Sequence, residues 1–251
     1  MTAGKPFRFP PGTTLVNELA AAMERVRAYG VTYPDGYYPA LLDKYTREGV
    51  LYPHILMILG QPRISKHFFY PRALARPGRL LDYGCGTGDN VRQLLRDGFS
   101  RDRIAAFDIN RASIELGFDV YRDEAEIGDL FSVAEEFPFG HAGFHTVYSA
   151  SVIHVIEGEE DLRTYLANAW SALRPGGVFF GSTLGLVPGG TPPSRDAWVP
   201  RRLMPEEELD RFLAGAGFVS REYVLRNHVP HHVGDGSESL CVFEFCAGKP
   251  G

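Results

Sequence analysis

The feature that most constrains the fold is LLDYGCGTGDN at residues 80–90, an apolar run followed by three alternating glycines. Gly84, Gly86 and Gly88 can adopt positive φ and let a ligand approach the backbone closely. The helix expected to follow them offers unpaired backbone N–H groups at its start. A turn of this kind between a buried strand and a helix predicts a site for a nucleotide-like ligand.

The residues around the turn narrow the kind of nucleotide. A dinucleotide fingerprint, GxGxxG, needs a small third residue at position 89, where the chain has Asp89. Asp89 at the start of a helix would also repel a pyrophosphate, so the spacing disfavours a nicotinamide dehydrogenase. An adenosine that carries a positive sulfonium and an amino-acid tail fits better. Asp82 is suited to face the ammonium group of this ligand. The alternative is that Asp82 only caps the turn.

A second acidic residue supports this interpretation. Asp108 lies twenty residues beyond Gly88, at the end of the next predicted strand. A carboxylate at that position accepts hydrogen bonds from ribose hydroxyls. The alternative is that Asp108 only caps the next helix. The glycine turn, the acid at a strand end and the α/β order favour the ligand-binding interpretation together.

The rest of the chain alternates apolar runs with amphipathic runs, as in doubly wound parallel sheets. Strands are predicted at 79–83, 103–108, 144–150 and 177–183, with a short one near 125–129. Helices are predicted at 89–97, 111–122, 159–173 and 205–215. The tail strands 222–227 and 241–247 have no helix between them and are expected to pair antiparallel. We therefore predict an α/β fold with a mostly parallel, doubly wound sheet and an antiparallel C-terminal hairpin.

The N-terminal part has helical periodicity and predicts a helical lid. Leu15, Leu19, Met23 and Val26 fall on one face of a helix. We assign residues 1–70 to this N-terminal cap and residues 71–251 to the ligand-binding domain.

Composition excludes several partners. The formal net charge is −5, with a sequence pI near 5.9 and no Lys/Arg cluster, which argues against nucleic acid or an anionic membrane. No stretch approaches the length of apolar sequence that spans a bilayer. The odd set of Cys85, Cys241 and Cys246 has no metal spacing and is typical of free thiols in a reducing compartment. We expect a cytoplasmic protein with a small-molecule substrate.

Four segments resemble the motifs of the class I S-adenosylmethionine-dependent methyltransferases: LLDYGCGTGDN, AAFDIN at 105–110, GDLF at 128–131 and ALRPGGVFFGS at 172–182. The resemblance covers about residues 79–247. It implies a Rossmann-like, seven-stranded sheet and S-adenosyl-L-methionine as the cofactor. The cofactor-binding residues that it implies are Asp82, Gly84, Gly86, Gly88, Asp108, Ile109, Asp129, Leu130 and Ser149. The block ASIELGFDVYRD at 112–123 is also similar to fungal natural-product methyltransferases, which implies a small-molecule acceptor.

The acceptor is expected beyond the carboxyl ends of the strands. His154 follows the fourth predicted strand by a few residues and is a candidate general base for a hydroxyl acceptor. An alternative of equal weight is that His154 only lines the pocket or orients the substrate.

Aromatic side chains predict where the substrate lies. Tyr37 and Tyr38 from the cap and Trp198 from the loop at 186–205 are candidate substrate contacts, since aromatic faces can enclose a sulfonium and an apolar substrate. The alternative for the two tyrosines is packing of the cap on the sheet. Arg201 and Arg202 are either contacts for an acidic substrate or solvated surface charges.

No metal site is expected. His228, His231 and His232 are close in sequence but lack a cysteine or carboxylate at ligand spacing. His141 and His145 are expected to be structural.

The leading hypothesis is in-line methyl transfer from S-adenosylmethionine to a small molecule, with oxygen of a secondary metabolite as the preferred acceptor. One alternative is a protein that binds S-adenosylmethionine without methylating and promotes a cyclisation. Another is a catalytically silent binding module. The sequence leaves open nitrogen or carbon as the acceptor atom, the substrate and the oligomeric state.

Overall fold

Seven strands form one sheet in the order β3-β2-β1-β4-β5-β7-β6. The computed structural model describes residues 12–50, 54–191, 202–226 and 239–251. The strands are β1 (Leu80–Tyr83), β2 (Ile104–Asp108), β3 (Phe131–Val133), β4 (Phe144–Ala150), β5 (Leu173–Leu186), β6 (Val219–Arg226) and β7 (Leu240–Gly248). β1 to β5 run parallel, and β7 pairs antiparallel with both β5 and β6. The predicted doubly wound, mostly parallel sheet with an antiparallel C-terminal hairpin is confirmed.

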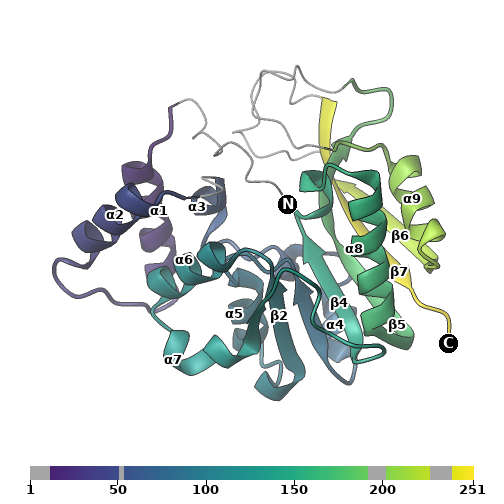
Figure 1. Cartoon of the computed structure of the whole chain (residues 1–251), viewed down its shortest axis with the longest axis horizontal. Helices are drawn as coiled ribbons and strands as arrows, with labels where there is room; N and C mark the ends of the chain where they lie inside the picture. Colours follow the sequence, from purple (N-terminus) through teal and green to yellow (C-terminus); the bar gives the residue numbers. More distant parts are fainter. Residues whose placement is uncertain (1–11, 51–53, 192–201, 227–238) are drawn as a thin grey trace.

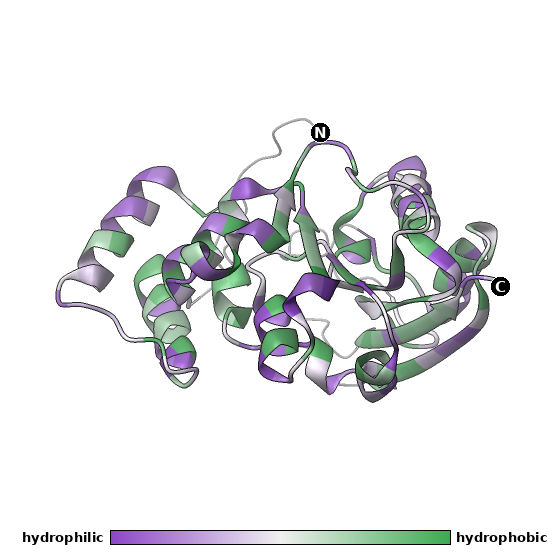
Figure 2. Cartoon of the chain, turned by 90° about the horizontal axis from the view of Figure 1, so that it is seen from below, coloured by the Kyte–Doolittle hydropathy of each residue, from purple (hydrophilic) through white to green (hydrophobic). Residues whose placement is uncertain are grey.

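Helices cover both faces of this sheet (Figure 1). The helices are α1 (Leu15–Arg27), α2 (Tyr37–Glu48), α3 (His54–Ile58), α4 (Tyr70–Ala75), α5 (Asp89–Arg96), α6 (Arg111–Tyr121), α7 (Glu124–Ile127), α8 (Glu159–Ala172) and α9 (Glu206–Gly215). One core cluster joins α4, α5 and α6 to the sheet face that carries Leu80 and Ala106. The opposite face, with Leu81 and Phe107, packs against α8 and α9. Figure 2 shows that apolar residues dominate the strands, whereas the helices alternate apolar and polar residues.

Two predicted strands differ from the structure. The segment 125–129 is not a strand: it forms α7 and a short 3-10 turn, and β3 begins at Phe131. The single large apolar residue of this segment, Ile127, belongs to α7 and is buried. β5 extends beyond the predicted 177–183 at both ends, because β7 pairs with it as far as Leu186 and Leu173 pairs with β4.

The cap helices α1, α2 and α3 gather beside α6 (Figure 1). Leu19 and Met23 of α1 share one buried cluster with Leu116 and Val120 of α6. Burial of such side chains contributes about 1.5–3 kcal/mol each. The cap therefore lies on the helix that follows the acidic end of β2. Within the described ranges, no helix has both the length and the apolar character needed to cross a membrane.

Candidate functional site

The glycine turn follows β1 at the carboxyl edge of the sheet. Gly84, Gly86 and Gly88 all have positive φ, at 79°, 55° and 76°. A Cβ on Gly84 would lie 2.3 Å from Val152 Cγ2, and one on Gly88 would lie 2.6 Å from the Phe131 ring. Over Gly86 the nearest atom would be Cδ1 of Ile55, at 3.5 Å. Packing therefore demands glycine at the two outer positions, whereas a methyl group on Gly86 would make only an ordinary van der Waals contact with the cap.

Asp108 ends β2 and turns back to this loop. Its Oδ2 accepts a hydrogen bond from the Gly86 N–H at 2.8 Å, and its Oδ1 accepts one from the Asn110 N–H at 2.8 Å. Burial raises the pKa of Asp108, and the backbone donors partly oppose this rise. Ile109, the next residue, is 47% exposed, which is high for a large apolar side chain in this chain. An acid at a strand end beside an exposed apolar side chain is suited to a ribose and its base.

Asp82 lies in β1, with its side chain fully buried. Neither carboxyl oxygen has a hydrogen-bond partner within the described part of the chain. Burial raises the pKa of Asp82 to about 8, and interaction with the Asn90 side chain only partly offsets the effect. Buried polar groups are almost always hydrogen-bonded, so an unpartnered carboxyl group indicates a missing ligand. A cationic group that reaches Asp82 would satisfy it.

Asp89 has a structural role that the sequence did not reveal. Its Oδ1 accepts hydrogen bonds from the Gly60 N–H at 2.5 Å and the Tyr121 hydroxyl at 2.6 Å. The Thr87 hydroxyl donates to Oδ2. Asp89 therefore ties the glycine turn to the segment after α3 and to the end of α6.

His154 lies just beyond β4, in a 3-10 turn that covers Ile153–Val155, and is 5% exposed. Its Nδ1 accepts a hydrogen bond from the Leu184 N–H at 3.1 Å and lies 3.2 Å from the Thr183 hydroxyl oxygen. Burial, followed by the charges of Arg63 and His54, lowers the pKa of His154 to about 3. The ring is therefore neutral at physiological pH. Because Nδ1 accepts, the ring proton lies on Nε2.

Two residues beside His154 were missed by the sequence reasoning. Arg63 is half-buried, and its Nη1 donates to the hydroxyl of Ser151, the residue that follows β4. Ser151 has a positive φ of 62°, which is rare outside glycine. No sequence signal marks this strained backbone. The sequence around Arg63, QPRISK, also gave no indication of its place at the sheet edge.

Asp129 and Leu130, predicted to contact adenine, lie elsewhere. They precede β3, so they lie at the amino end of this parallel strand. Asp129 forms an ion pair with Arg101, and Leu130 is buried in the core. The prediction placed them one short turn too early, because β3 begins only at Phe131. The residue that leaves the carboxyl end of β3 is Ala134.

Tyr37 and Tyr38, predicted to contact the substrate, hold the cap together instead. The Tyr37 hydroxyl donates to the carbonyl oxygen of Asp119 at 2.7 Å, in the last part of α6 and far along the helix from Asp108. The Tyr38 hydroxyl donates to the carbonyl oxygen of Val16 at 3.0 Å. Packing of the cap, the alternative considered from the sequence, accounts for both contacts.

Other predicted residues have mixed placements. Ser149 lies in β4 with its hydroxyl 2.7 Å from the Tyr165 hydroxyl, so its side chain supports the sheet from the α8 side. Arg202 is a structural residue: its backbone N–H donates to the His154 carbonyl oxygen at 3.0 Å, and its guanidinium donates to the Glu157 carbonyl oxygen at 3.0 Å. The remaining candidates lie outside the described residues: Trp198, Arg201, His228, His231 and His232. Within the described residues, no group of three or more His, Cys, Asp or Glu side chains is arranged to hold a metal.

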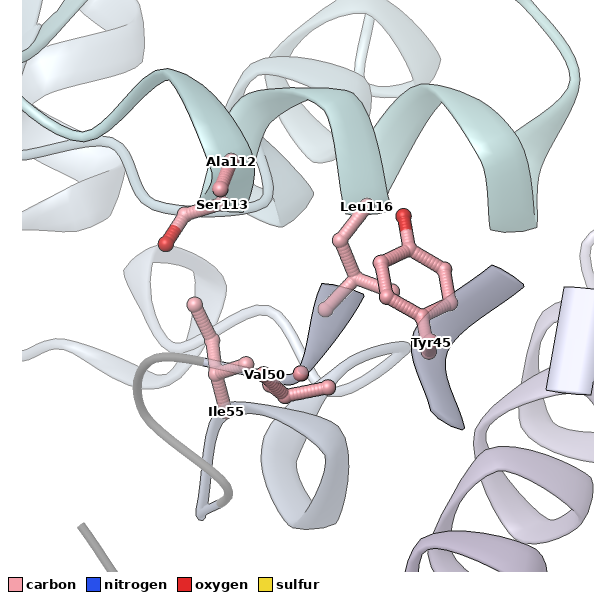
Figure 3. A pocket seen from close by; sticks show the side chains of 7 residues that line it. Tyr45, Val50, Ile55, Ala112, Ser113 and Leu116 are labelled. Carbon is pink, nitrogen blue, oxygen red and sulfur yellow. The ribbon is translucent and has the colours of Figure 1, made fainter. Parts of the chain in front are cut away.

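A small cavity of about 20 Å³ separates the cap from the start of α6. Figure 3 shows Ser113 and Leu116 of α6 on one side and Val50 and Ile55 on the other. Ile55 is also the side chain nearest to the space over Gly86. The cap therefore closes over the glycine turn and the beginning of α6 together.

Comparison with known proteins assigns this arrangement to a class. Residues 80–177 match the model of a methyltransferase domain. Together with the strand order and the glycine turn, this match shows that the chain carries a class I S-adenosylmethionine-dependent methyltransferase domain, and the predicted cofactor is confirmed.

The matched relatives and structures support the same class. The chain is 32% identical over 126 residues to the ubiquinone/menaquinone biosynthesis C-methyltransferase UbiE of Vibrio parahaemolyticus, covering 49% of this chain and 48% of the relative. It is 34% identical over 119 residues to the O-methyltransferase rstn1 of Aspergillus nomiae, covering 45% and 50%. The chain thus spans about half the length of these curated relatives.

A solved structure shares the fold over nearly the whole chain. The geranyl diphosphate C-methyltransferase of Streptomyces coelicolor, solved with S-adenosylhomocysteine, aligns with a TM-score of 0.62 at 16% identity, covering 95% of this chain and 99% of that one. At this identity, the likeness establishes the fold alone.

Proposed function

We propose that the protein transfers the methyl group of S-adenosylmethionine to an oxygen of a small molecule, such as a secondary metabolite. The observation that carries the proposal is the glycine turn after β1, with Asp108 hydrogen-bonded to the Gly86 N–H and His154 beyond the end of the neighbouring β4. This arrangement provides one place for an adenosyl group and an adjacent place for an acceptor.

Each side chain then has a defined part in binding the cofactor. The carboxylate of Asp108 accepts hydrogen bonds from the ribose hydroxyls, and Ile109 covers the base. Asp82, whose buried oxygens lack partners, receives the ammonium group of the amino-acid tail. When bound, the cofactor supplies an electrophilic methyl group on a positive sulfur. The chain itself chiefly aligns the acceptor with that methyl, and alignment of this kind supplies much of the rate.

His154 acts as an orienting donor rather than as a base in this proposal. Its Nδ1 already accepts the Leu184 N–H, and its pKa is about 3. A general base works best with a pKa near the operating pH, which His154 does not have. The Nε2–H group is suited to donate a hydrogen bond to an acceptor oxygen. Similarity to the O-methyltransferase of Aspergillus nomiae supports oxygen as the acceptor. Carbon is the alternative that the C-methyltransferase UbiE represents, and the mass of the product fragments distinguishes the two.

The experiment is a screen of phenolic and carboxylic small molecules with S-adenosylmethionine, followed by mass spectrometry of cofactor and acceptor. Methyl transfer requires S-adenosylhomocysteine and a product heavier by one methylene unit in equal amounts. An acceptor that rearranges while the cofactor stays unchanged would instead support the cyclase alternative. Failure to bind the cofactor in calorimetry would support the silent module.

A further inference from the structure

Arg63 is held rigidly at the carboxyl end of β4. Its guanidinium donates to the hydroxyl of Ser151, whose backbone has a φ of 62°. Its backbone N–H and that of Ile64 donate to Oδ1 of Asn90 at 3.1 and 3.2 Å, at the start of α5. A positive φ outside glycine costs on the order of 1–3 kcal/mol and persists at functional sites where the surroundings enforce it. Both partners of this hydrogen bond are therefore fixed in advance.

The guanidinium of Arg63 has weaker acceptors than those of other arginines that are at least partly buried. Arg92 pairs with Asp123 at 2.7 Å, and Arg25 donates to the carbonyl oxygens of Leu56 and Leu59. Within the described ranges, Arg63 has no carboxylate at ion-pairing distance, and its guanidinium donates to the Ser151 hydroxyl.

The nearest negative charge does not neutralise Arg63. Asp89 acts on it only at longer range, and the Asp89 oxygens already accept hydrogen bonds from Gly60, Tyr121 and Thr87. Burial lowers the pKa of Arg63, because removal from water disfavours the charged form of the guanidinium. A desolvated cation without a counter-ion is costly, and an anionic ligand would relieve that cost.

The surroundings place this cation on the acceptor side of the site. The charge of Arg63 lowers the pKa of His154. The pKa shifts of Asp82 and Asp108 arise from burial and from other neighbours. His154 presents an N–H donor because its Nδ1 accepts from Leu184. Arg63, through its hydrogen bond to Ser151, and His154, in the turn at 153–155, thus both lie just beyond β4. Two donors in this region, one of them charged, suit a group that only accepts hydrogen bonds.

We propose that Arg63 binds a carboxylate group of the methyl acceptor, so that the substrate is a carboxylic acid bound as its anion. This inference rests on the proposed methyl transfer. One carboxylate oxygen is held by Arg63, and a lone pair of the other forms the new bond to the methyl carbon. The carbon–sulfur bond breaks, and its electron pair stays on sulfur, so the products are a methyl ester and a neutral thioether. No proton moves, which agrees with the absence of a base at His154.

The test measures binding of acetate, the smallest carboxylate of this class, to 15N-labelled full-length protein saturated with S-adenosylhomocysteine. Acetamide is the neutral probe of the same shape, and ionic strength is held constant. The Arg63 side-chain N–H signal is identified by its loss in Arg63→Gln. We expect acetate, and not acetamide, to shift this signal in a saturable way. Arg47→Gln, which removes an exposed arginine paired with Asp43, is the matched control and keeps the response.

Two results would overturn the proposal: no saturable response to acetate in the protein saturated with S-adenosylhomocysteine, or an equal response to acetamide. An acetate response that the cofactor-free protein shows and the saturated protein lacks would instead assign Arg63 to the cofactor's own carboxylate. Arg63→Lys retains a charge and serves if the glutamine variant does not fold; it must still bind acetate, more weakly. Calorimetry with S-adenosylmethionine tests the proposed function separately. A wild-type protein that does not bind the cofactor refutes that function, whereas one that binds it and gives no acetate response refutes only the role of Arg63.

Discussion

The carboxylate of Asp108 accepts a hydrogen bond from the backbone N–H of Gly86 across 2.8 Å, although the two residues are 22 positions apart. This contact joins the end of β2 to the middle of the glycine turn after β1. It fixes the acid beside the one glycine of the turn at which an added Cβ would meet no close contact. Cofactor binding should therefore depend on Asp108 more than the fold does.

Asp108→Asn is expected to weaken binding of S-adenosylmethionine about tenfold to hundredfold. Hydrogen bonds to charged groups contribute about 1.5–3 kcal/mol, which corresponds to that range of affinity. Isothermal calorimetry with S-adenosylmethionine and S-adenosylhomocysteine measures the loss. Asp43→Asn, at an exposed ion pair on α2, is the control and should bind normally. Equal affinities of wild type and Asp108→Asn would remove this acid from the site.

Gly84→Ala and Gly86→Ala should separate folding from binding. At Gly84 the new Cβ would meet Val152 at 2.3 Å, so overpacking of about 1–3 kcal/mol adds to the backbone cost of about 1–2 kcal/mol. At Gly86 only the backbone cost applies to the free protein, while the methyl group would meet a cofactor bound against the turn. We expect Gly84→Ala to show the larger fall in unfolding free energy by denaturant titration. Gly86→Ala should show the larger loss of cofactor affinity relative to its loss of stability; the opposite order would contradict the proposal that the cofactor lies against Gly86.

Local patterns predicted much of this site because its key contacts follow strand ends. The glycine spacing and the acid at the end of β2 are set by residues close in sequence. Asp129 shows how such reasoning fails: an error of a few residues in the start of β3 moves a side chain from the carboxyl edge to the amino edge of a parallel sheet. Strand starts are the least determined part of a short apolar pattern.

The acceptor side was less predictable because tertiary contacts define it. Tyr37 and Tyr38 looked suited to a ligand, yet their hydroxyls find backbone carbonyls of α6 and α1. Conversely, the hydrogen bond of the Arg63 guanidinium to Ser151, without a carboxylate partner among the described residues, joins positions that are far apart in the sequence and that no linear pattern connects. The positive φ of Ser151 is likewise visible only in the folded chain.

Asp82 should release a proton when the cofactor binds. Its pKa of about 8 leaves the carboxyl group largely neutral at pH 7, and the incoming ammonium group favours the ionised form. We expect release of roughly one proton per S-adenosylmethionine bound at pH 7, because a carboxyl group is mostly protonated when the pH lies about one unit below its pKa. Calorimetry in buffers of different ionisation enthalpy measures this number. Asp82→Asn should release none, and unchanged proton release in that variant would assign the proton to another group.

The same burial predicts how stability of the ligand-free protein depends on pH. The folded pKa of Asp82, about 8, lies above its ordinary value of 3.8, so the folded state retains this proton after the unfolded state has lost it. The stabilising contribution is complete below pH 3.8 and is lost as pH rises to 8. The melting temperature of wild type should therefore fall relative to Asp82→Asn between these pH values. A difference that stays constant across this window would show that Asp82 does not titrate there.

His154 should contribute no ionisation to the pH dependence of turnover between about pH 5 and 8. Burial holds its pKa near 3, so the ring stays neutral throughout this range and donates from Nε2. His154→Gln retains an N–H donor and is expected to lower kcat/KM about tenfold or less, whereas His154→Ala, which leaves the acceptor oxygen without this donor, should lower it about tenfold to hundredfold. Steady-state kinetics of all three proteins across the range, with the acceptor found by the screen, make the comparison. An inflection near pH 6 to 7 in wild type that vanishes in both variants would instead identify His154 as a general base.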